Sequence, residues 1–221
     1  MSYYFDYKPK SASINWEWGL KRSNNSGWWD NVSKNFNLTQ EDVRQNADKI
    51  NWYYLSENRK FPFDENFLVE FEDKIEWNAY VANHRISEKT YLRFKKHISL
   101  SLFLKRTTEN KVKMVRKYFD QLSGYRAEYQ YVRGEYQYSE RDEIFYEISL
   151  PEKFLEENAK DDKEWEIIAQ NQKLSKAFIE KHWDKFKFID LMKNHRLYGK
   201  LKDWFPKEYE KFKETREGKY Y

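Results

Sequence analysis

The chain of 221 residues contains no cysteine, only six glycines and four prolines. Without cysteine it has no disulfide, no thiolate nucleophile and no cysteine ligand for zinc or an iron–sulfur cluster. The scattered glycines form no phosphate-binding loop. The only imidazoles are His84, His97, His182 and His195, and no two of them have the His-x3-His spacing of a zinc-binding helix. The sequence therefore predicts neither a metal nor another cofactor.

Long apolar runs are also missing. No run approaches the ~20 residues that a membrane-spanning helix needs, and the first residues lack the basic-then-apolar order of a signal peptide. We therefore expect a soluble protein of a reducing cytoplasm. The net charge is only +4, from 41 basic and 37 acidic residues. Strong attraction of the whole chain to nucleic acid is not expected, so that only local charge is informative.

Aromatic residues are abundant instead. The chain has nine Trp, 16 Phe and 18 Tyr, although all hydrophobic residues together make up only 39%. Each aromatic side chain buries roughly 150–250 Å². We therefore expect a folded chain whose core depends on aromatic rings.

The aromatic residues follow a repeat in which an asparagine comes six positions after the aromatic residue. The five matches are Trp29 with Asn35, Trp52 with Asn58, Trp77 with Asn83, Trp165 with Asn171, and Phe188 with Asn194. Each match starts a short apolar helix pattern, and a Ser, Thr or Asp then introduces a second one. The predicted fold is a mainly α array of short helix-turn-helix repeats of 23–25 residues, with an inserted basic helix and a small β-hairpin.

Helix starts and domain boundaries follow from this pattern. Capping boxes are predicted at Thr39 with Asp42 and at Ser149 with Glu152, and Asp64 and Ser87 are further N-caps. Residues 1–28 are interpreted as an N-terminal cap, 29–104 as repeats one to three and 105–148 as an insertion. Residues 149–221 contain repeats four and five and a capping helix over 206–217.

The insertion is basic and rich in tyrosine. Between residues 105 and 117, six Lys and Arg face one acid, Glu109, and an apolar stripe predicts an amphipathic helix there. From Tyr125 to Tyr138 the alternation favours a hairpin that turns at Gly134, although the same residues also fit a helix. The predicted partner-binding residues are Lys105, Arg106, Lys111, Lys113, Arg116, Lys117, Tyr125, Arg126, Tyr129, Tyr131, Arg133, Tyr136 and Tyr138. The alternative is a solvated helix face beside structural tyrosines.

The repeat, read as W-Y-Y-L-S-E-N at Trp52 and W-E-I-I-A-Q-N at Trp165 and followed by Asp-Lys-hydrophobic-x-Trp, resembles a known type. It is similar to the tandem short helical repeats of poorly characterised proteins of tailed bacteriophages and large DNA viruses. The resemblance covers residues 29–100 and 149–205. It implies a viral or mobile-element origin and a binding role, and it brings no catalytic residues.

The repeated residues are better explained by structure than by chemistry. The tryptophans are predicted to pack between repeats rather than to stack on a ligand, because their spacing follows the repeat. The asparagines are predicted to bond free backbone groups at bends rather than to bind substrate. With 37 acidic residues, no acid–base pair can be singled out. We therefore do not expect an enzyme.

Two functional hypotheses remain. The first is a non-enzymatic inhibitor or adaptor that binds a host protein in a bacterial cell, such as a CRISPR nuclease or a nuclease–RNA complex. The second is an RNA- or single-stranded-DNA-binding protein that uses the basic, tyrosine-rich insertion, since Lys and Arg can contact phosphates while tyrosines stack on bases.

Overall fold

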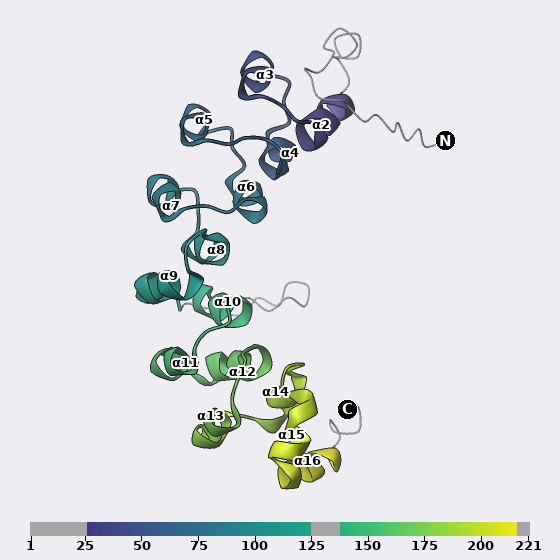
Figure 1. Ribbon diagram of the computed structural model, residues 1–221, viewed down its shortest axis with the longest axis vertical. Coiled ribbons are helices and arrows are strands. Elements are labelled where there is room, and N and C mark those ends of the chain that lie inside the picture. Colours follow the sequence, from purple (N-terminus) through teal and green to yellow (C-terminus); the bar gives the residue numbers. More distant parts are fainter. Residues whose placement is uncertain (1–25, 125–137, 216–221) are drawn as a thin grey trace, which may run out of the picture. The chain divides into compact units, whose positions relative to one another are not determined.

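The computed structural model describes residues 26–124 and 138–215. These residues form short helices joined by short loops, and no strand occurs among them beyond an isolated bridge between Ile86 and Thr107 (Figure 1). The mainly helical array predicted from the sequence is confirmed for this part of the chain. The protein divides into two compact units between His84 and Arg85, called unit 1 and unit 2 below.

Unit 1 contains two rows of helices (Figure 1). Its helices are α2 (Ser26–Asn35), α3 (Gln40–Gln45), α4 (Trp52–Glu57), α5 (Glu65–Glu70) and α6 (Trp77–Asn83). Helix α4 packs against α2 and against α6, while α3 and α5 form the second row. Most of the predicted N-terminal cap, residues 1–25, lies outside the described residues, and residues 26–28 belong to α2.

Unit 2 continues the same alternation. Its helices are α7 (Glu88–Phe94), α8 (Leu100–Arg106), α9 (Lys111–Tyr118), α10 (Glu140–Glu147), α11 (Glu152–Asn158), α12 (Asp162–Asn171), α13 (Lys176–Lys181), α14 (Phe188–Lys193), α15 (Tyr198–Trp204) and α16 (Pro206–Lys213), with 3-10 turns at Phe119–Gln121 and Trp183–Lys185. Helices α8, α10, α12 and α14 pack in succession, and α7, α9, α11 and α13 form the other row (Figure 1).

The predicted single basic helix over 105–117 is wrong. Lys105 and Arg106 end α8, the loop from Thr107 to Asn110 follows, and α9 begins at Lys111. Helix α8 crosses the boundary predicted at Leu104 and packs against α10 as α10 packs against α12. The described parts of 105–148 therefore belong to the stacked rows. Neither α8 nor α10 begins with an aromatic residue, and the aromatic-x5-Asn pattern therefore could not detect these helices.

Short polar side chains start most of these helices. The predicted capping box of Thr39 with Asp42 is confirmed, and so are the N-caps Asp64 and Ser87. The capping box predicted at Ser149 is wrong, because α11 begins after Pro151 without a side-chain cap. The final helix begins at Pro206 as predicted but ends at Lys213 rather than at residue 217.

Aromatic rings fill the core, as the composition suggested. In unit 1, Phe67 is fully buried and packs against Phe61, Phe71 and Trp52. The indole of Trp52 is half-buried and donates to the carbonyl of Ala47 at 3.1 Å. Such contacts within and between helix pairs support the structural role predicted for the tryptophans.

In each of four helix pairs, one polar side chain hydrogen-bonds to backbone carbonyls of the preceding helix pair. We call this side chain the clamp. In unit 1, Asn58 donates through Nδ2 to the carbonyls of Ser33 and Phe36, at 2.9 Å each. In unit 2, Asn194 donates in the same way to Ala169 and Gln172, at 2.8 and 2.9 Å. Both asparagines are buried, and three of these four hydrogen bonds are buried with them, so the clamp satisfies backbone carbonyls inside the protein.

The clamp is not always the asparagine that the sequence pattern picked out. At α12 the clamp is Gln172, which donates to Phe145 and to Ile148 and accepts from the Leu150 N–H at 3.0 Å. The side chain of the neighbouring Asn171 bonds only the Ile167 carbonyl of its own helix. The role predicted for Asn171 is therefore wrong by one position.

The same displacement occurs at α6 in unit 1. His84 takes the clamp position, with Nε2 at 3.1 Å from the Ser56 carbonyl, and the ring must donate because the carbonyl can only accept. Asn83 instead bonds the carbonyl of Ala79 in its own helix. Asn35 bonds the side chain of Asn31. Among the five predicted asparagines, Asn58 and Asn194 alone donate to carbonyls of the preceding helix pair in the described residues, while Asn83 accepts from Arg59 of that pair at 3.3 Å.

Candidate interaction surfaces

The predicted binding residues divide between described and undescribed parts of the chain. Lys105, Arg106, Lys111, Lys113, Arg116, Lys117 and Tyr138 are described. Tyr125, Arg126, Tyr129, Tyr131, Arg133 and Tyr136, together with the hairpin predicted there, lie outside the described residues. The geometry below therefore rests on seven of the thirteen.

Lys105 is held against α10 rather than presented to solvent. Its Nζ lies 3.1 Å from a carboxylate oxygen of Glu143 and 3.3 Å from one of Glu147, and its side chain is only 17% exposed. The two acids are one helical turn apart on α10, so they reach the same cation. This lysine joins α8 to α10 and has no free charge to offer a partner.

Tyr138 meets a second exposed ring that the sequence analysis did not single out. Its ring lies 5.9 Å from that of Tyr146 in a stacked arrangement. Tyr138 is 41% exposed and Tyr146 is 52% exposed. We call these residues the tyrosine pair. Tyr146 follows Glu143 by three positions in α10, and residues three apart are neighbours on a helix surface, so the pair lies beside an acidic partner of Lys105.

Lys117 is likewise engaged within unit 2. Its Nζ lies 2.7 Å from Glu88 at the start of α7, and the buried Tyr118 donates its hydroxyl to the same carboxylate. Hydrogen bonds from Lys117 and Tyr118 lower the pKa of Glu88 below its ordinary value. Burial, and then the bond to Glu88, raises the pKa of Tyr118. Lys117 thus links α9 to α7.

Four predicted cations remain without a partner. Arg106, Lys111, Lys113 and Arg116 are exposed and make no ion pair within the described ranges 26–124 and 138–215. The last three belong to α9. The structure therefore separates the predicted site into a tyrosine pair beside acids on α10 and a set of unpaired cations on and just before α9.

Two of the histidines have structural contacts. His84 is the clamp described above, and His182 packs against the rings of Trp165 and Phe178. No group of three or more His, Asp and Glu side chains suited to a metal ion occurs among the residues that the structure describes.

None of the described helices combines the length and the low polarity needed to cross a bilayer. Comparison with protein-family models, with curated proteins and with solved structures gives no match.

Proposed function

We propose that this chain is a non-enzymatic binding protein whose target is another protein, held at the tyrosine pair of α10. The observation that carries the proposal is the stacked and exposed pair of Tyr138 and Tyr146. Tyrosine is enriched at binding hot spots, because it offers a large amphipathic surface and has few rotatable bonds.

The charges beside the pair favour a protein over a nucleic acid. Glu143 and Glu147 lie on α10 with Tyr146, and Lys105 sits between the two acids. Phosphates would be repelled by these carboxylates, whereas a protein partner can match a surface of both signs. A ring pair within a mixed-charge surround resembles the aromatic centre and polar rim of protein interfaces.

The resemblance to tandem repeats of phage and large-virus proteins extends the proposal to the class of partner. On that basis the partner is a host protein of a bacterial cell, and the chain acts as an inhibitor of a defence system, for example of a CRISPR nuclease. Inhibition would then follow from occupation of the partner's surface rather than from chemistry on it.

The test is affinity capture from a bacterial lysate treated with nuclease, with the full chain as bait. The wild-type chain should retain a specific protein and lower its activity, and the double variant Tyr138→Ala/Tyr146→Ala should lose both effects. Truncation of hot-spot residues typically costs about 2 kcal/mol or more each. Tyr198→Ala is the matched control, since Tyr198 is 40% exposed and lies in α15 of the same unit.

Two results would sink the proposal. One is a double variant that folds like the wild type and still captures and inhibits the same protein as strongly. The other is a capture that depends on nucleic acid and disappears when the lysate is treated with nuclease.

A further inference from the structure

Helix α10, at the tyrosine pair, is acidic. It contains four acids and one base, a net charge of −3. The base, Arg141, is buried against Glu164, so its charge does not reach the surface. Glu143 and Glu147 do reach solvent, with side chains that are 37% and 49% exposed. The exposed surface of α10 is therefore negative.

One lysine faces these two acids and does not neutralise them. The Nζ of Lys105 lies 3.1 Å from Oε2 of Glu143 and 3.3 Å from Oε1 of Glu147. Among the residues that the structure describes, the second oxygen of each carboxylate makes no hydrogen bond. Two negative charges thus meet one positive charge, and each acid keeps an oxygen for a further donor. This surface is suited to one more cation.

The acids lie beside the exposed rings. Ser139 is the N-cap of α10, so Tyr138 is the residue before the cap and Glu143 is the fourth helical residue. Residues in these two positions are neighbours at the start of a helix. Glu143 also comes three positions before Tyr146, which makes the two side chains neighbours on the helix surface. Glu143 is therefore next to both rings, which stack at 5.9 Å.

Unit 1 shows what such a combination of ring and carboxylate holds. Lys34 lies over the ring of Tyr54 at 5.0 Å and pairs at 3.4 Å with Glu57, which comes three positions later in α4. The chain thus supplies its own cation there. At the tyrosine pair it does not, because within residues 26–124 and 138–215 no Lys or Arg lies over the ring of Tyr138 or Tyr146.

A buried contact in unit 2 shows that a guanidinium suits this combination. Arg141 lies over the ring of Phe119 at 4.3 Å and donates to Glu164 at 2.8 Å. A planar guanidinium meets a ring with its face while its N–H groups reach carboxylates. An ammonium is a strongly hydrated point charge, and Lys105 already fills the place between the two acids of α10. The cation that fits is therefore an arginine.

We infer that the partner protein places an arginine side chain on the tyrosine pair, with its guanidinium against the exposed rings and its N–H groups donating to the free oxygens of Glu143 and Glu147. The inference rests on the proposed function and names the residue that the partner supplies. Arginine is itself enriched at hot spots, and hot spots tend to pair across an interface. The partner's surface is basic where it meets α10.

The test is fluorescence anisotropy with the full chain and a labelled glycine-rich peptide that contains arginine. Salt is kept at about 0.1 M, where the Debye length is about 10 Å and distant charges of the chain contribute little. In two further peptides the arginine is replaced, by lysine to keep the charge and by citrulline to keep the shape without the charge. The wild type should bind the arginine peptide most tightly and the citrulline peptide least.

The variant is Glu143→Gln/Glu147→Gln, which removes both charges and keeps the size of both side chains. It should bind the arginine peptide about 10-fold more weakly, which corresponds to about 1.4 kcal/mol. The double variant Tyr138→Ala/Tyr146→Ala should weaken binding to a similar extent, because the guanidinium loses the rings.

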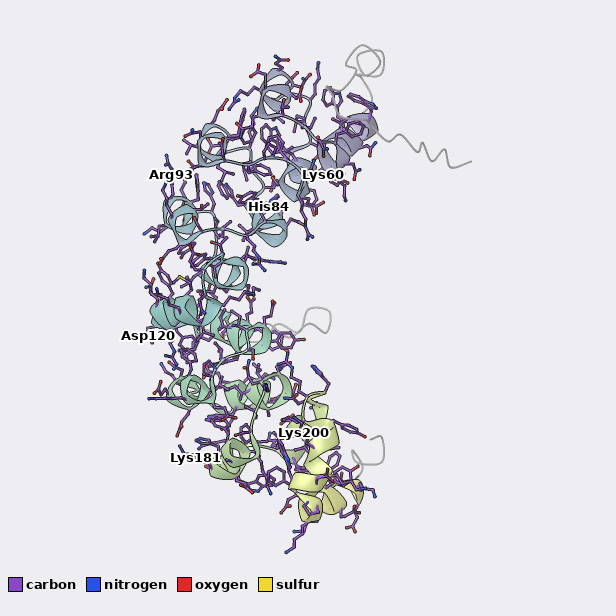
Figure 2. The ribbon with its side chains drawn as sticks, viewed as in Figure 1. Lys60, His84, Arg93, Asp120, Lys181 and Lys200 are labelled. Atoms are coloured by element: carbon purple, nitrogen blue, oxygen red, sulfur yellow. The ribbon has the colours of Figure 1, made fainter. Side chains whose placement is uncertain are left out.

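The matched control is Glu157→Gln/Glu180→Gln, which removes two exposed acids that also pair with lysines. These acids lie on α11 and α13, in the other row of unit 2, where Lys181 marks α13 in Figure 2. The control should bind the arginine peptide like the wild type.

Four results would overturn the inference. They are no binding of the arginine peptide by the wild type, a lysine peptide that binds at least as tightly, an acid variant of α10 that binds like the wild type, and an equal loss in the control. Circular dichroism checks that each variant is folded. If the double acid variant does not fold, Glu147→Gln alone leaves Lys105 paired with Glu143 and should bind about 3-fold more weakly, half of the loss in free energy.

Peptide binding and lysate capture fail separately. A chain that captures a host protein through the tyrosine pair but does not bind the arginine peptide overturns this inference and leaves the proposed function. Binding of the arginine peptide at the tyrosine pair without capture of any protein overturns the proposed function, while the arginine site stands.

Discussion

Two successive junctions in unit 2, α10 with α12 and α12 with α14, have the same clamp in different surroundings. Gln172 closes the first and Asn194 the second, each by donating to two carbonyls of the preceding helix pair. The first junction also contains a buried ion pair, in which Arg141 Nε donates to Glu164 at 2.8 Å. At the second junction the buried Asp190 of α14 instead accepts from Gln170 of α12 at 2.9 Å and pairs with Lys193 of its own helix, so that its ion pair does not cross the junction.

The ion pair is well satisfied where it lies. Arg141 also donates to the carbonyl of Asn158 at 2.6 Å and lies over the ring of Phe119, while Glu164 accepts from the Lys160 N–H at 2.6 Å. The side chains of Arg141 and Glu164 are only 7% and 3% exposed. Loss of one partner would leave the other charge buried, whereas loss of both would not.

The largest effect is thus expected from breaking this pair on one side. Arg141→Ala should lower the free energy of unfolding by about 3–5 kcal/mol, because Glu164 keeps a buried and unpaired charge. The double variant Arg141→Met/Glu164→Gln should recover much of this loss, since it removes both charges and keeps an acceptor for Lys160. Urea unfolding of the full chain gives both values. A double variant that loses as much stability as Arg141→Ala, or more, would contradict a coupled pair.

A smaller effect is expected at the second junction, between α12 and α14. Asn194→Ala should cost about 1–3 kcal/mol, because two buried carbonyls lose their donor. Asn171→Ala, which the repeat pattern places in the same class, should change stability by about 0.5 kcal/mol or less, as it loses one bond within its own helix. Equal thermal shifts for the two variants would remove the distinction between clamp and helix-end asparagines.

The smallest effect concerns the imidazole clamp of unit 1 and appears only in acid. Burial lowers the pKa of His84, and nearby Arg59 lowers it further, so the unfolded chain binds the proton more readily. The free energy of unfolding should be constant above the pKa of His84 in the unfolded chain, which is about 6.5. It should fall as the pH drops from there through the pKa of His84 in the folded protein.

His84→Asn is the matched change, because asparagine is the clamp in both units and does not titrate. The variant should have the same free energy of unfolding as the wild type near neutral pH. This free energy should fall less than that of the wild type as the pH is lowered. Unfolding curves at several pH values between about 5 and 7.5, a range that brackets the ordinary histidine pKa, measure the difference. An identical pH profile for the wild type and the variant would show that His84 plays no part in it.

The architecture could be predicted because it depends on spacing. The aromatic and capping residues recur with the helix pairs, and the structure confirms helices at each of the five repeat matches. The clamp could not be placed, because α4 ends five residues after its tryptophan, at Glu57, whereas α12 ends six residues after its tryptophan, at Asn171, so that the adjacent Gln172 takes over. Only the fold shows that Gln172, and not Asn171, faces the preceding carbonyls.

The surfaces were harder to predict than the fold. The sequence indicated the cations of α9, but Lys105 and Lys117 are held by Glu143 and Glu88 from distant parts of the chain. Tyr146 gave no signal of its own, since its exposure depends on how α10 packs. Whether a cation is left without an ion pair depends on acidic residues that are far from it in the sequence.

Every clamp donates to carbonyls that precede it in the sequence, and this order has a consequence during synthesis. The donors lie 22 to 28 positions after the carbonyls that they satisfy. During synthesis, which proceeds from the N-terminus, the carbonyls of each helix pair stay without these partners until the next clamp has left the ribosome. The nascent protein thus completes its hydrogen bonds one pair behind the point of elongation.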